Sequence, residues 1–273
     1  MASTYPAGAL STAFVLAIMV MATCAPWLAP YNPTTQGMAH RLARPSLAHL
    51  LGTDDFGRDV LSRLIVGSRT TLLTAILSVV LACMIGGLVG TLAGYFGGRL
   101  DAALMLAIDI MLSFPLVLLA LLIVAVLGAG MLNLILAVGI SQIPLFARVS
   151  RSLVLTLRSH AYVEAARSLG AGHVRILRLH VVPNMLGPIG VQVTTTMGLA
   201  IVTTASLSFL GLGIQPPTPD WGAMVFEARR FLFDRPDMLF YPAAAIVGAV
   251  VSLNVLADTL STILDPTARR VVV

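Results

Sequence analysis

The chain has 273 residues, of which 58% are hydrophobic and only 11% are charged. Because soluble domains average about 25% charged residues, this composition excludes an ordinary soluble protein. All 17 of its Lys or Arg residues are arginines, so the chain lacks the lysine of a Walker A phosphate loop, and any ATP that it uses must be hydrolysed by another protein.

Long apolar tracts divide the chain into six predicted membrane spans, because a spanning helix needs about 20 apolar residues. The first has no basic residue ahead of it and a poor cleavage site, so we expect a retained anchor, with a signal peptide as the alternative. Gly128-Ala129-Gly130 favours a turn between the third and fourth spans. We therefore expect an all-α membrane protein with spans near 9–27, 70–94, 104–127, 131–150, 188–210 and 239–262.

The arginines favour one orientation by a narrow margin. With the N-terminus inside, nine arginines lie on the inner side and eight on the outer side. The six arginines of residues 147–187 flank span ends, where the positive-inside bias is most reliable. Five of the outer arginines share residues 30–69 with three aspartates. We therefore expect a cytoplasmic N-terminus, and the net charge of +5 is ordinary for a membrane protein and gives no reason to expect nucleic acid.

A few polar side chains lie inside the predicted spans. Asp109 is an ionisable group within the third span, which makes it a functional candidate. We favour an ion pair with Arg148 or Arg151 of the fourth span, because an unpaired buried carboxylate is costly. Four further residues either line a transport pathway or merely bond neighbouring helices: Asn133, Gln142, Thr203 and Thr204.

Acidic residues also gather before the second span. Asp54, Asp55 and Asp59 are interleaved with Arg58 and Arg63, and a calcium-loop spacing is absent. The five histidines are scattered along the sequence. We therefore expect ion pairs in this segment and no metal site.

A water-facing segment, EAARSLGAGHVRILRLHVVPN from Glu164 to Asn184, interrupts the apolar sequence. Ser159 is the predicted N-cap of its first helix, and Gly170 is placed to stop that helix. Pro183 is predicted to break a second helix before the next span.

Two interpretations of this segment remain open from periodicity alone. Ala165 and Ala166 leave a low surface that another protein could approach closely, which favours a docking element for a cytoplasmic partner. The alternative is an amphipathic helix lying on anionic lipid headgroups, with its apolar side made of Val174, Leu177 and Val181.

The segment resembles the EAA loop of type I ABC-transporter permeases. It has the EAA triplet, a glycine four residues later, and HVVPN from His180 to Asn184. His180 stands where the general pattern has Ile, a variation that is common in the peptide branch of the family. In that family the loop forms a coupling helix, which inserts into a groove on the ATPase subunit. The resemblance implies these ATPase-coupling residues: Glu164, Ala165, Ala166, Gly170, His180, Pro183 and Asn184.

Three other motifs resemble the second permease of dipeptide, oligopeptide and nickel importers. They are LGTDDFGRDVLSRLIVGSRTTL (51–72), GYFGG (94–98) and LSFLGLGIQPPTPDWGAM (207–224). The resemblance implies a type I ABC importer permease fold with six transmembrane helices. It also implies that the protein lies in the inner membrane of a prokaryote, with both termini in the cytoplasm. It also implies a heterodimer with a sister permease, two ATPase subunits at the cytoplasmic face and an extracytoplasmic binding protein. ATP and Mg would bind the ATPases, so this chain would need no cofactor and would not be an enzyme.

The resulting domain plan has three parts. Residues 1–69 hold the first helix and an extracytoplasmic segment, 70–262 form a five-helix permease core containing a coupling loop at 151–187, and 263–273 form a cytoplasmic tail. The predicted function is ATP-driven import of di- or oligopeptides, with nickel, an opine or a glycoside as alternative cargo. Thr204 stands where many relatives carry an acid, which leaves the cargo open. From other classes, the alternatives are a cation-coupled carrier that uses Asp109 and a non-transporting scaffold.

Overall fold

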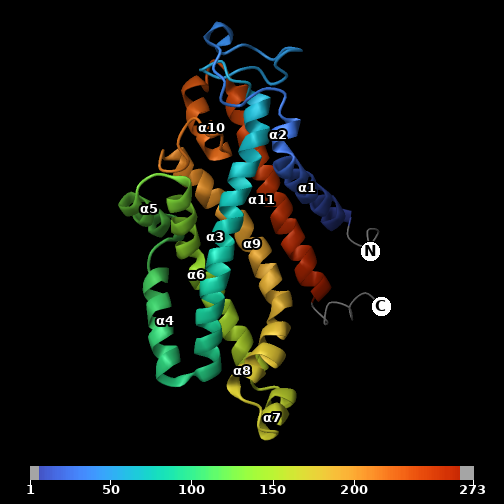
Figure 1. Cartoon of the computed structure of the whole chain (residues 1–273), viewed down its shortest axis with the longest axis vertical. Coiled ribbons are helices and arrows are strands. Elements are labelled where there is room, and N and C mark those ends of the chain that lie inside the picture. The colour runs from blue at the N-terminus through green and yellow to red at the C-terminus, as the bar shows by residue number, and fades with distance from the viewer. Residues whose placement is uncertain (1–5, 265–273) are drawn as a thin grey trace.

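The computed structural model describes residues 6–264, and the regular elements within that range are all helices (Figure 1). The predicted cytoplasmic position of both chain ends, and nearly all of the predicted tail, fall outside the described residues. In chain order the elements are α1 (Pro6–Thr23), α2 (Ala25–Leu28), η1 (Met38–His40), α3 (Val60–Phe96), α4 (Gly98–Leu112), α5 (Leu116–Leu127), α6 (Met131–Leu157), α7 (Ala161–Ser168), α8 (His173–Ile176), η2 (Leu177–Val181), α9 (Val182–Phe209), α10 (Trp221–Ala228), η3 (Arg229–Phe231) and α11 (Pro236–Leu264).

Four helical stretches within residues 6–264 are long and apolar enough to cross a membrane: α3, α6, His173–Phe209 and α11. The pair α4 and α5 adds a fifth if the two together form one broken span. The apolar part of α1, Gly8–Thr23, is shorter than this length criterion requires. The chain is therefore an all-helical membrane protein with four or five candidate spans.

The predicted third span, 104–127, is not a single helix. It is bent by 89° between α4 and α5. Pro115 has no N–H group to continue the helix, and its ring pushes the preceding residue out of the helical region. The N–H of Ser113 still reaches Asp109 O at 3.0 Å, and α5 then starts again from Pro115.

The predicted break at Pro183 is wrong, because the helix runs from His173 through Phe209. The turn ahead of Pro183, η2, is a π-helical turn in which the Val182 N–H donates to Leu177 O. Such one-turn π insertions shift the hydrogen-bond pattern by one residue within a continuous helix. Pro183 therefore sits in the first turn of α9, where an N–H group is not needed.

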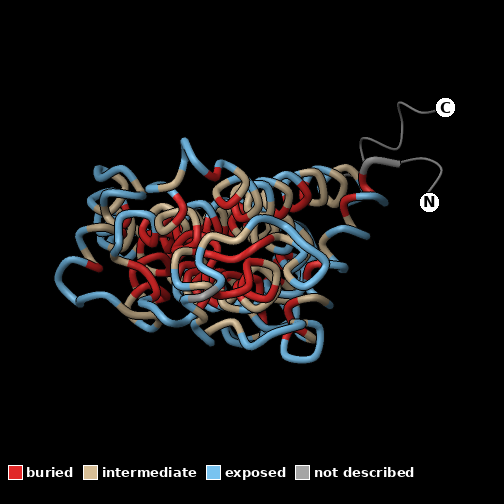
Figure 2. The backbone as a smooth tube through the Cα atoms, turned by 90° about the horizontal axis from the view of Figure 1, so that it is seen from above, coloured by how far each residue is buried: buried red, intermediate tan, exposed pale blue. Residues whose placement is uncertain are grey.

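Helix α3 is the centre of the molecule and packs against α1, α6 and α9 (Figure 1). Seen from above, the buried residues form a core surrounded by exposed backbone (Figure 2). A stripe of glycines, Gly86, Gly90 and Gly94, lies on α3 where it meets α6. A Cβ atom added at Gly90 would collide with the carbonyl oxygen of Ala147 on α6. Because the backbones touch, α3 and α6 form one closely packed pair.

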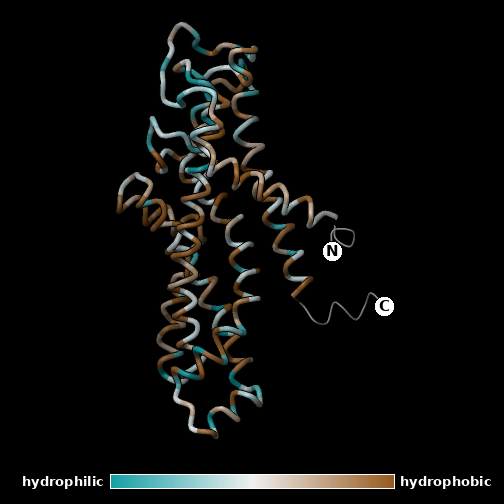
Figure 3. The backbone as a smooth tube through the Cα atoms, turned by 45° about the vertical axis from the view of Figure 1, so that its right-hand side comes forward, coloured by the Kyte–Doolittle hydropathy of each residue, from teal (hydrophilic) through white to brown (hydrophobic). Residues whose placement is uncertain are grey.

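The less hydrophobic segments are concentrated toward the two ends of the molecule (Figure 3). At the upper end of Figure 1, the loop between α2 and α3 lies beside α10. We call residues 29–59 together with α10 the cap. The 151–187 loop, with α7 and α8, lies at the opposite end. Long helices thus separate two polar surfaces, as expected for a membrane protein.

Candidate functional site

The N-cap of α7 lies one residue after the predicted one. The N-cap position is His160, whose side chain makes no capping hydrogen bond. The Ser159 hydroxyl donates instead to Thr156 O at 2.8 Å. Ser159 therefore helps to end α6, and its predicted role as the N-cap of α7 is wrong.

The end of α7 lies at the predicted residue. Gly170 has φ +81°, a conformation that glycine adopts without steric cost. The N–H of Ala171 donates to Ala166 O at 3.0 Å, and that of Gly170 donates to Arg167 O at 2.9 Å. These two bonds form a Schellman motif, which turns the chain sharply toward α8.

The inner face of the 151–187 loop has an apolar core of its own. Val163, Ile176 and Val181 are almost completely buried, and they pack with Tyr95 at the end of α3. Leu177 is half-buried against the same cluster. The alternative interpretation, in which Leu177 and Val181 belong to a lipid-facing side, is therefore wrong for these two residues, because both face the inside of the loop.

The outer face of the loop combines charge with exposed apolar groups. Glu164 and Ala165 are exposed on α7, and Leu169 and Val174 are 88% and 78% exposed. Ala166 is half-buried against the inner cluster. Of the two predicted alanines, Ala165 alone therefore offers its Cβ atom freely to a partner.

The remaining predicted coupling residues lie at the return into α9. The ring of His180 is 6.3 Å from that of Tyr162, centroid to centroid, so the π turn packs beside α7. The Asn184 Nδ2 donates to His180 O at 2.7 Å. Pro183 is exposed between them. These contacts make the two arms of the loop into one unit.

Two contacts that the sequence did not predict tie the loop to α3. The Tyr95 hydroxyl lies 3.0 Å from Nδ1 of His173 at the start of α8. Arg158 Nη1 donates to Gly94 O at 2.8 Å. The loop is thus attached to α3 as well as to α6 and α9, which continue from its ends.

Charged side chains of α4 and α6 form two ion pairs. Arg148 Nη2 donates to Asp109 Oδ1 at 2.8 Å, with both side chains more than half exposed. Arg151 pairs with Asp101 through two bonds, of 2.6 and 2.7 Å. Asp109 therefore has Arg148 as its partner, and Asp101 is a residue that the sequence analysis missed.

The four predicted pathway residues differ in what their polar atoms do. Asn133 Nδ2 donates to Leu127 O at 2.8 Å and so caps the end of α5. The Thr203 hydroxyl donates to Leu199 O, one turn earlier in α9. Gln142 and Thr204 are fully buried, and their side-chain polar atoms have no hydrogen-bond partner within residues 6–264. Both side chains therefore lie inside the helix bundle of this chain and have no exposed surface in this conformation.

The cap is held by a buried cluster of ion pairs. Arg58 Nε donates to Asp54 Oδ2 at 2.6 Å, and Arg58 and Arg63 both donate to Glu227 Oε2, at 2.9 and 2.8 Å. Carboxylate oxygens of Asp54, Asp55 and Glu227 lie within 4.8 Å of one another, a spacing compatible with a metal ion. Two guanidinium groups already bind these carboxylates, so the arrangement is that of an ion-pair cluster. Glu227, from α10, was not predicted.

A second buried contact joins α10 to α3. Asp220 is the N-cap of α10 and accepts hydrogen bonds from the Ala223 N–H at 3.1 Å and the Thr71 hydroxyl at 2.7 Å. The Thr71 oxygen in turn accepts from the Trp221 N–H at 3.1 Å. Burial raises the pKa of Asp220 above the usual range for aspartate. The cap is therefore attached firmly to the central helix.

Comparison with known proteins identifies the family. Residues 86–270 match the family described as binding-protein-dependent transport system inner membrane components. Residues 6–45 match the N-terminal transmembrane domain of oligopeptide transport permease C. The chain belongs to the binding-protein-dependent transport permeases.

Similar proteins agree in both sequence and fold. The glutathione transport system permease protein GsiD of Salmonella typhimurium is 45% identical over 93% of this chain and 84% of its own length, and that of Escherichia coli O157:H7 is 43% identical over the same shares. A chain of the MetNI methionine ABC transporter, in an inward-facing conformation, superimposes with a TM-score of 0.63 over 75% of this permease and 98% of that chain, at 18% identity. The permease therefore has the helical fold of ABC importer permeases.

Several properties of the permease follow from its family. The permease is a multi-pass inner-membrane protein and a transport subunit that is not itself an enzyme. As a component of a binding-protein-dependent system, it implies an ATPase, a binding protein and a partner permease. A cation-coupled carrier built on Asp109 does not fit this family.

Proposed function

We propose that this permease forms the translocation pathway of a peptide importer together with a different sister permease, and that the 151–187 loop docks on one of two ATPase subunits. The observation that carries the proposal is the outer face of α7. There an exposed Glu164 and a small Ala165 lie next to the exposed apolar side chain of Leu169. Such a surface suits a protein groove, since apolar contacts there exclude water.

The proposed topology has six crossings, with both termini in the cytoplasm. It counts α1 as the first span and the bent α4–α5 pair as the third. The 151–187 loop then faces the cytoplasm, where its exposed arginines agree with the positive-inside bias. The cap faces outward, where it can meet a binding protein.

The proposed coupling runs through contacts already described. The loop continues into α6 and α9 and is tied to α3 by Tyr95 and Arg158. Because α3 and α6 pack backbone to backbone at Gly90, the 151–187 loop and helices α3, α6 and α9 can turn as a unit when the ATPases close. Closely packed helices transmit such a displacement without absorbing it.

Short peptides are the proposed cargo, and glutathione is the first to test because the GsiD relatives are named as glutathione permeases. Nickel, an opine or a glycoside remain alternatives. Gln142 and Thr204 are fully buried and have no hydrogen-bond partner within residues 6–264, so we propose that they reach the pathway only when α6 and α9 move during transport. The hydroxyl of Thr204 would contact cargo by hydrogen bonding rather than by charge.

Transport in reconstituted vesicles tests the proposal. The permease would be assembled with its sister permease, ATPases and binding protein, and uptake of labelled glutathione, a labelled dipeptide and nickel would be measured with and without ATP. We expect ATP-dependent uptake of at least one of the two peptides. Uptake of nickel alone would contradict the cargo, and ATP-independent uptake would contradict the mechanism.

Cysteine labelling tests the topology separately. In a background in which Cys24 and Cys83 are replaced by serine, a cysteine at Ser168 should resist a membrane-impermeant thiol reagent applied from outside. A cysteine at Thr218, which is exposed in the segment before α10, should react. The opposite pattern would contradict the proposed orientation.

A further inference from the structure

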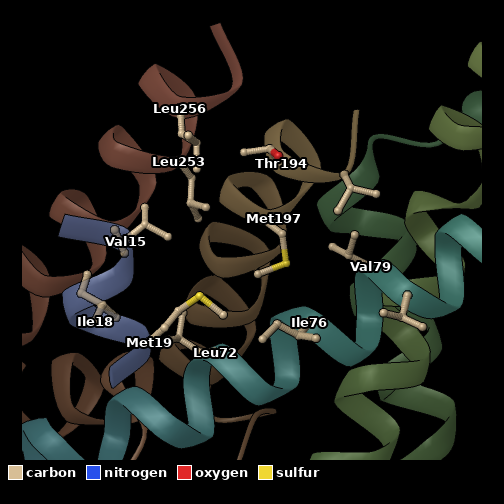
Figure 4. Close-up of a pocket in the computed structure, with 13 residues that line it drawn as sticks. Val15, Ile18, Met19, Leu72, Ile76, Val79, Thr194, Met197, Leu253 and Leu256 are labelled. Carbon is tan, nitrogen blue, oxygen red and sulfur yellow. The ribbon is translucent and has the colours of Figure 1, made fainter. Parts of the chain in front are cut away.

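A groove lined by apolar side chains lies where α1, α3, α9 and α11 meet (Figure 4). Its volume is about 320 Å³. Side chains from all four helices point into it, including Val15, Ile76, Met197 and Leu253 (Figure 4). The groove is therefore separate from both the 151–187 loop and the cap.

The chemistry of the groove suits hydrocarbon. Among the described residues that line it, Thr194 alone is polar, and the Thr194 hydroxyl donates to Gly190 O of its own helix at 2.9 Å. A peptide placed here would leave its amide groups without hydrogen bonds, which is unfavourable. The groove thus excludes peptide cargo and accepts an alkyl chain.

One end of the groove carries a positive charge. A second cavity of about 280 Å³ shares Met19, Leu72 and Ile76 with the first, and its lining includes Arg69 on α3. Arg69 is exposed, and no carboxylate within residues 6–264 lies at salt-bridge distance from it. The two cavities together form a groove with a cation at its mouth and an apolar body.

The position of Arg69 matches a membrane interface. After Arg69 the chain has no charged residue until Arg99, and the part of α3 from Arg69 to its end at Phe96 is about 40 Å long at 1.5 Å per residue. A guanidinium group at the edge of such a tract lies where phospholipid headgroups lie. The apolar body of the groove then extends from that edge into the hydrocarbon layer.

We propose that this groove is a binding site for one membrane phospholipid, with its phosphodiester on Arg69 and an acyl chain along α3, α9 and α11. Arginine binds phosphate oxygens through paired N–H groups, which gives such a contact both strength and orientation. The lipid belongs to the leaflet on the side of the cap. Bound there, it fills the space between α1 and the helices that carry the coupling motion.

A photoreactive lipid tests the site without any substitution. The probe is phosphatidylglycerol with a photoreactive group in its acyl chain, added to the complete transporter in nanodiscs. We expect mass spectrometry to find the label on peptides that contain Met19, Met197 or Leu253. Labelling confined to other faces of the permease would overturn the proposal.

Matched variants test the two parts of the site. Arg69→Gln removes the charge, and Val80→Trp fills the groove from a side chain that is 47% exposed. Each should weaken retention of phosphatidylglycerol by the purified complex roughly tenfold, as loss of a charge-assisted contact or of the space predicts. The controls Arg44→Gln, in the cap, and Val126→Trp, on α5, should retain lipid as the wild type does. Equal retention in all variants would overturn the proposal.

Two further results would identify a different occupant. Displacement of the lipid by soluble glycerophosphate at the same concentration would show that Arg69 binds phosphate without the groove. Disulfide formation between a cysteine at Val80 and the sister permease would show that a protein helix covers the groove. Either result would overturn the lipid site.

Discussion

The Tyr95 hydroxyl and His173 Nδ1, 78 residues apart in the sequence, lie 3.0 Å from each other. The contact joins the end of the central helix α3 to the start of α8. It is one of two side-chain hydrogen bonds within residues 6–264, with that of Arg158 to Gly94 O, that tie the 151–187 loop to α3. The proposed coupling therefore predicts a functional effect for a residue that neither lines a pathway nor faces a partner.

Tyr95→Phe should reduce coupling while leaving assembly intact. The substitution removes one hydrogen bond, with a net value of about 0.5–1.5 kcal/mol, and retains the ring that packs edge-on against Phe96. We expect the amount of cargo imported per ATP hydrolysed to fall roughly two- to tenfold in vesicles, with normal ATPase co-purification. The control is Tyr162→Phe on α7. An unchanged ratio in Tyr95→Phe would show that this contact carries no motion.

Gly90→Ala should destabilise the permease, whereas Gly87→Ala should not. A Cβ atom at Gly90 meets the Ala147 carbonyl oxygen, whereas the nearest atom to one at Gly87 is 3.9 Å away. Overpacking costs about 1–3 kcal/mol, and Ala is favoured over Gly in a helix by up to about 1 kcal/mol. Thermal unfolding in detergent should show a lower midpoint for Gly90→Ala and an equal or higher one for Gly87→Ala. Equal midpoints would contradict the close contact of α3 with α6.

Thr71→Val should loosen α10 from α3. The Thr71 hydroxyl donates to Asp220 Oδ1 and accepts from the Trp221 N–H, so its loss removes both hydrogen bonds, and a buried polar group without its partner costs about 1–3 kcal/mol. Hydrogen exchange should accelerate in α10 and stay unchanged in α7. Thr70→Val is the matched control, because the Thr70 hydroxyl takes no part in this network. Equal exchange in the two variants would rule out the contact as an anchor.

The stability of the cap should depend on pH through Asp220. Burial raises the pKa of this carboxyl in the folded protein. The contribution of its protonated form to the free energy of unfolding is therefore fully present at pH values below the pKa of aspartate in the unfolded chain, about 3.9. It is lost as pH rises through the folded pKa. The free energy of unfolding should therefore fall with rising pH across that window, and the slope from this group should vanish in Asp220→Asn. An unchanged or steeper slope in Asp220→Asn would contradict the assignment.

Local sequence signals located the helices well but not their contacts. Gly170 stops α7 through a motif that involves only neighbouring residues, so the sequence was sufficient there. The two prolines show the limit: Pro115 bends the chain by 89°, while Pro183 is accommodated by a π turn. A proline removes the same N–H group in both places, and the surrounding packing decides between a bend and a continuous helix.

The candidate site was also predicted only in outline, because the sequence marks local segments but not the contacts between them. The EAA triplet marked the loop, but the partner of Val163 on the inside is Ile176, across a turn whose direction periodicity does not give. This is why Ala166, and not Ala165, proved half-buried. Glu227, Tyr95 and Asp101 were missed because their partners lie 50 to 169 residues away in the sequence.

The most direct test of the central claim is the amount of ATPase that co-purifies with the permease carrying Ala165→Trp. Ala165 is exposed on the outer face of α7, so tryptophan there should leave the fold intact and prevent close seating in a partner's groove. The control is Ala102→Trp, at an exposed position on α4. We predict that Ala165→Trp loses most of its bound ATPase while keeping its sister permease, and that Ala102→Trp keeps both. Wild-type amounts of ATPase with Ala165→Trp would contradict docking through the 151–187 loop.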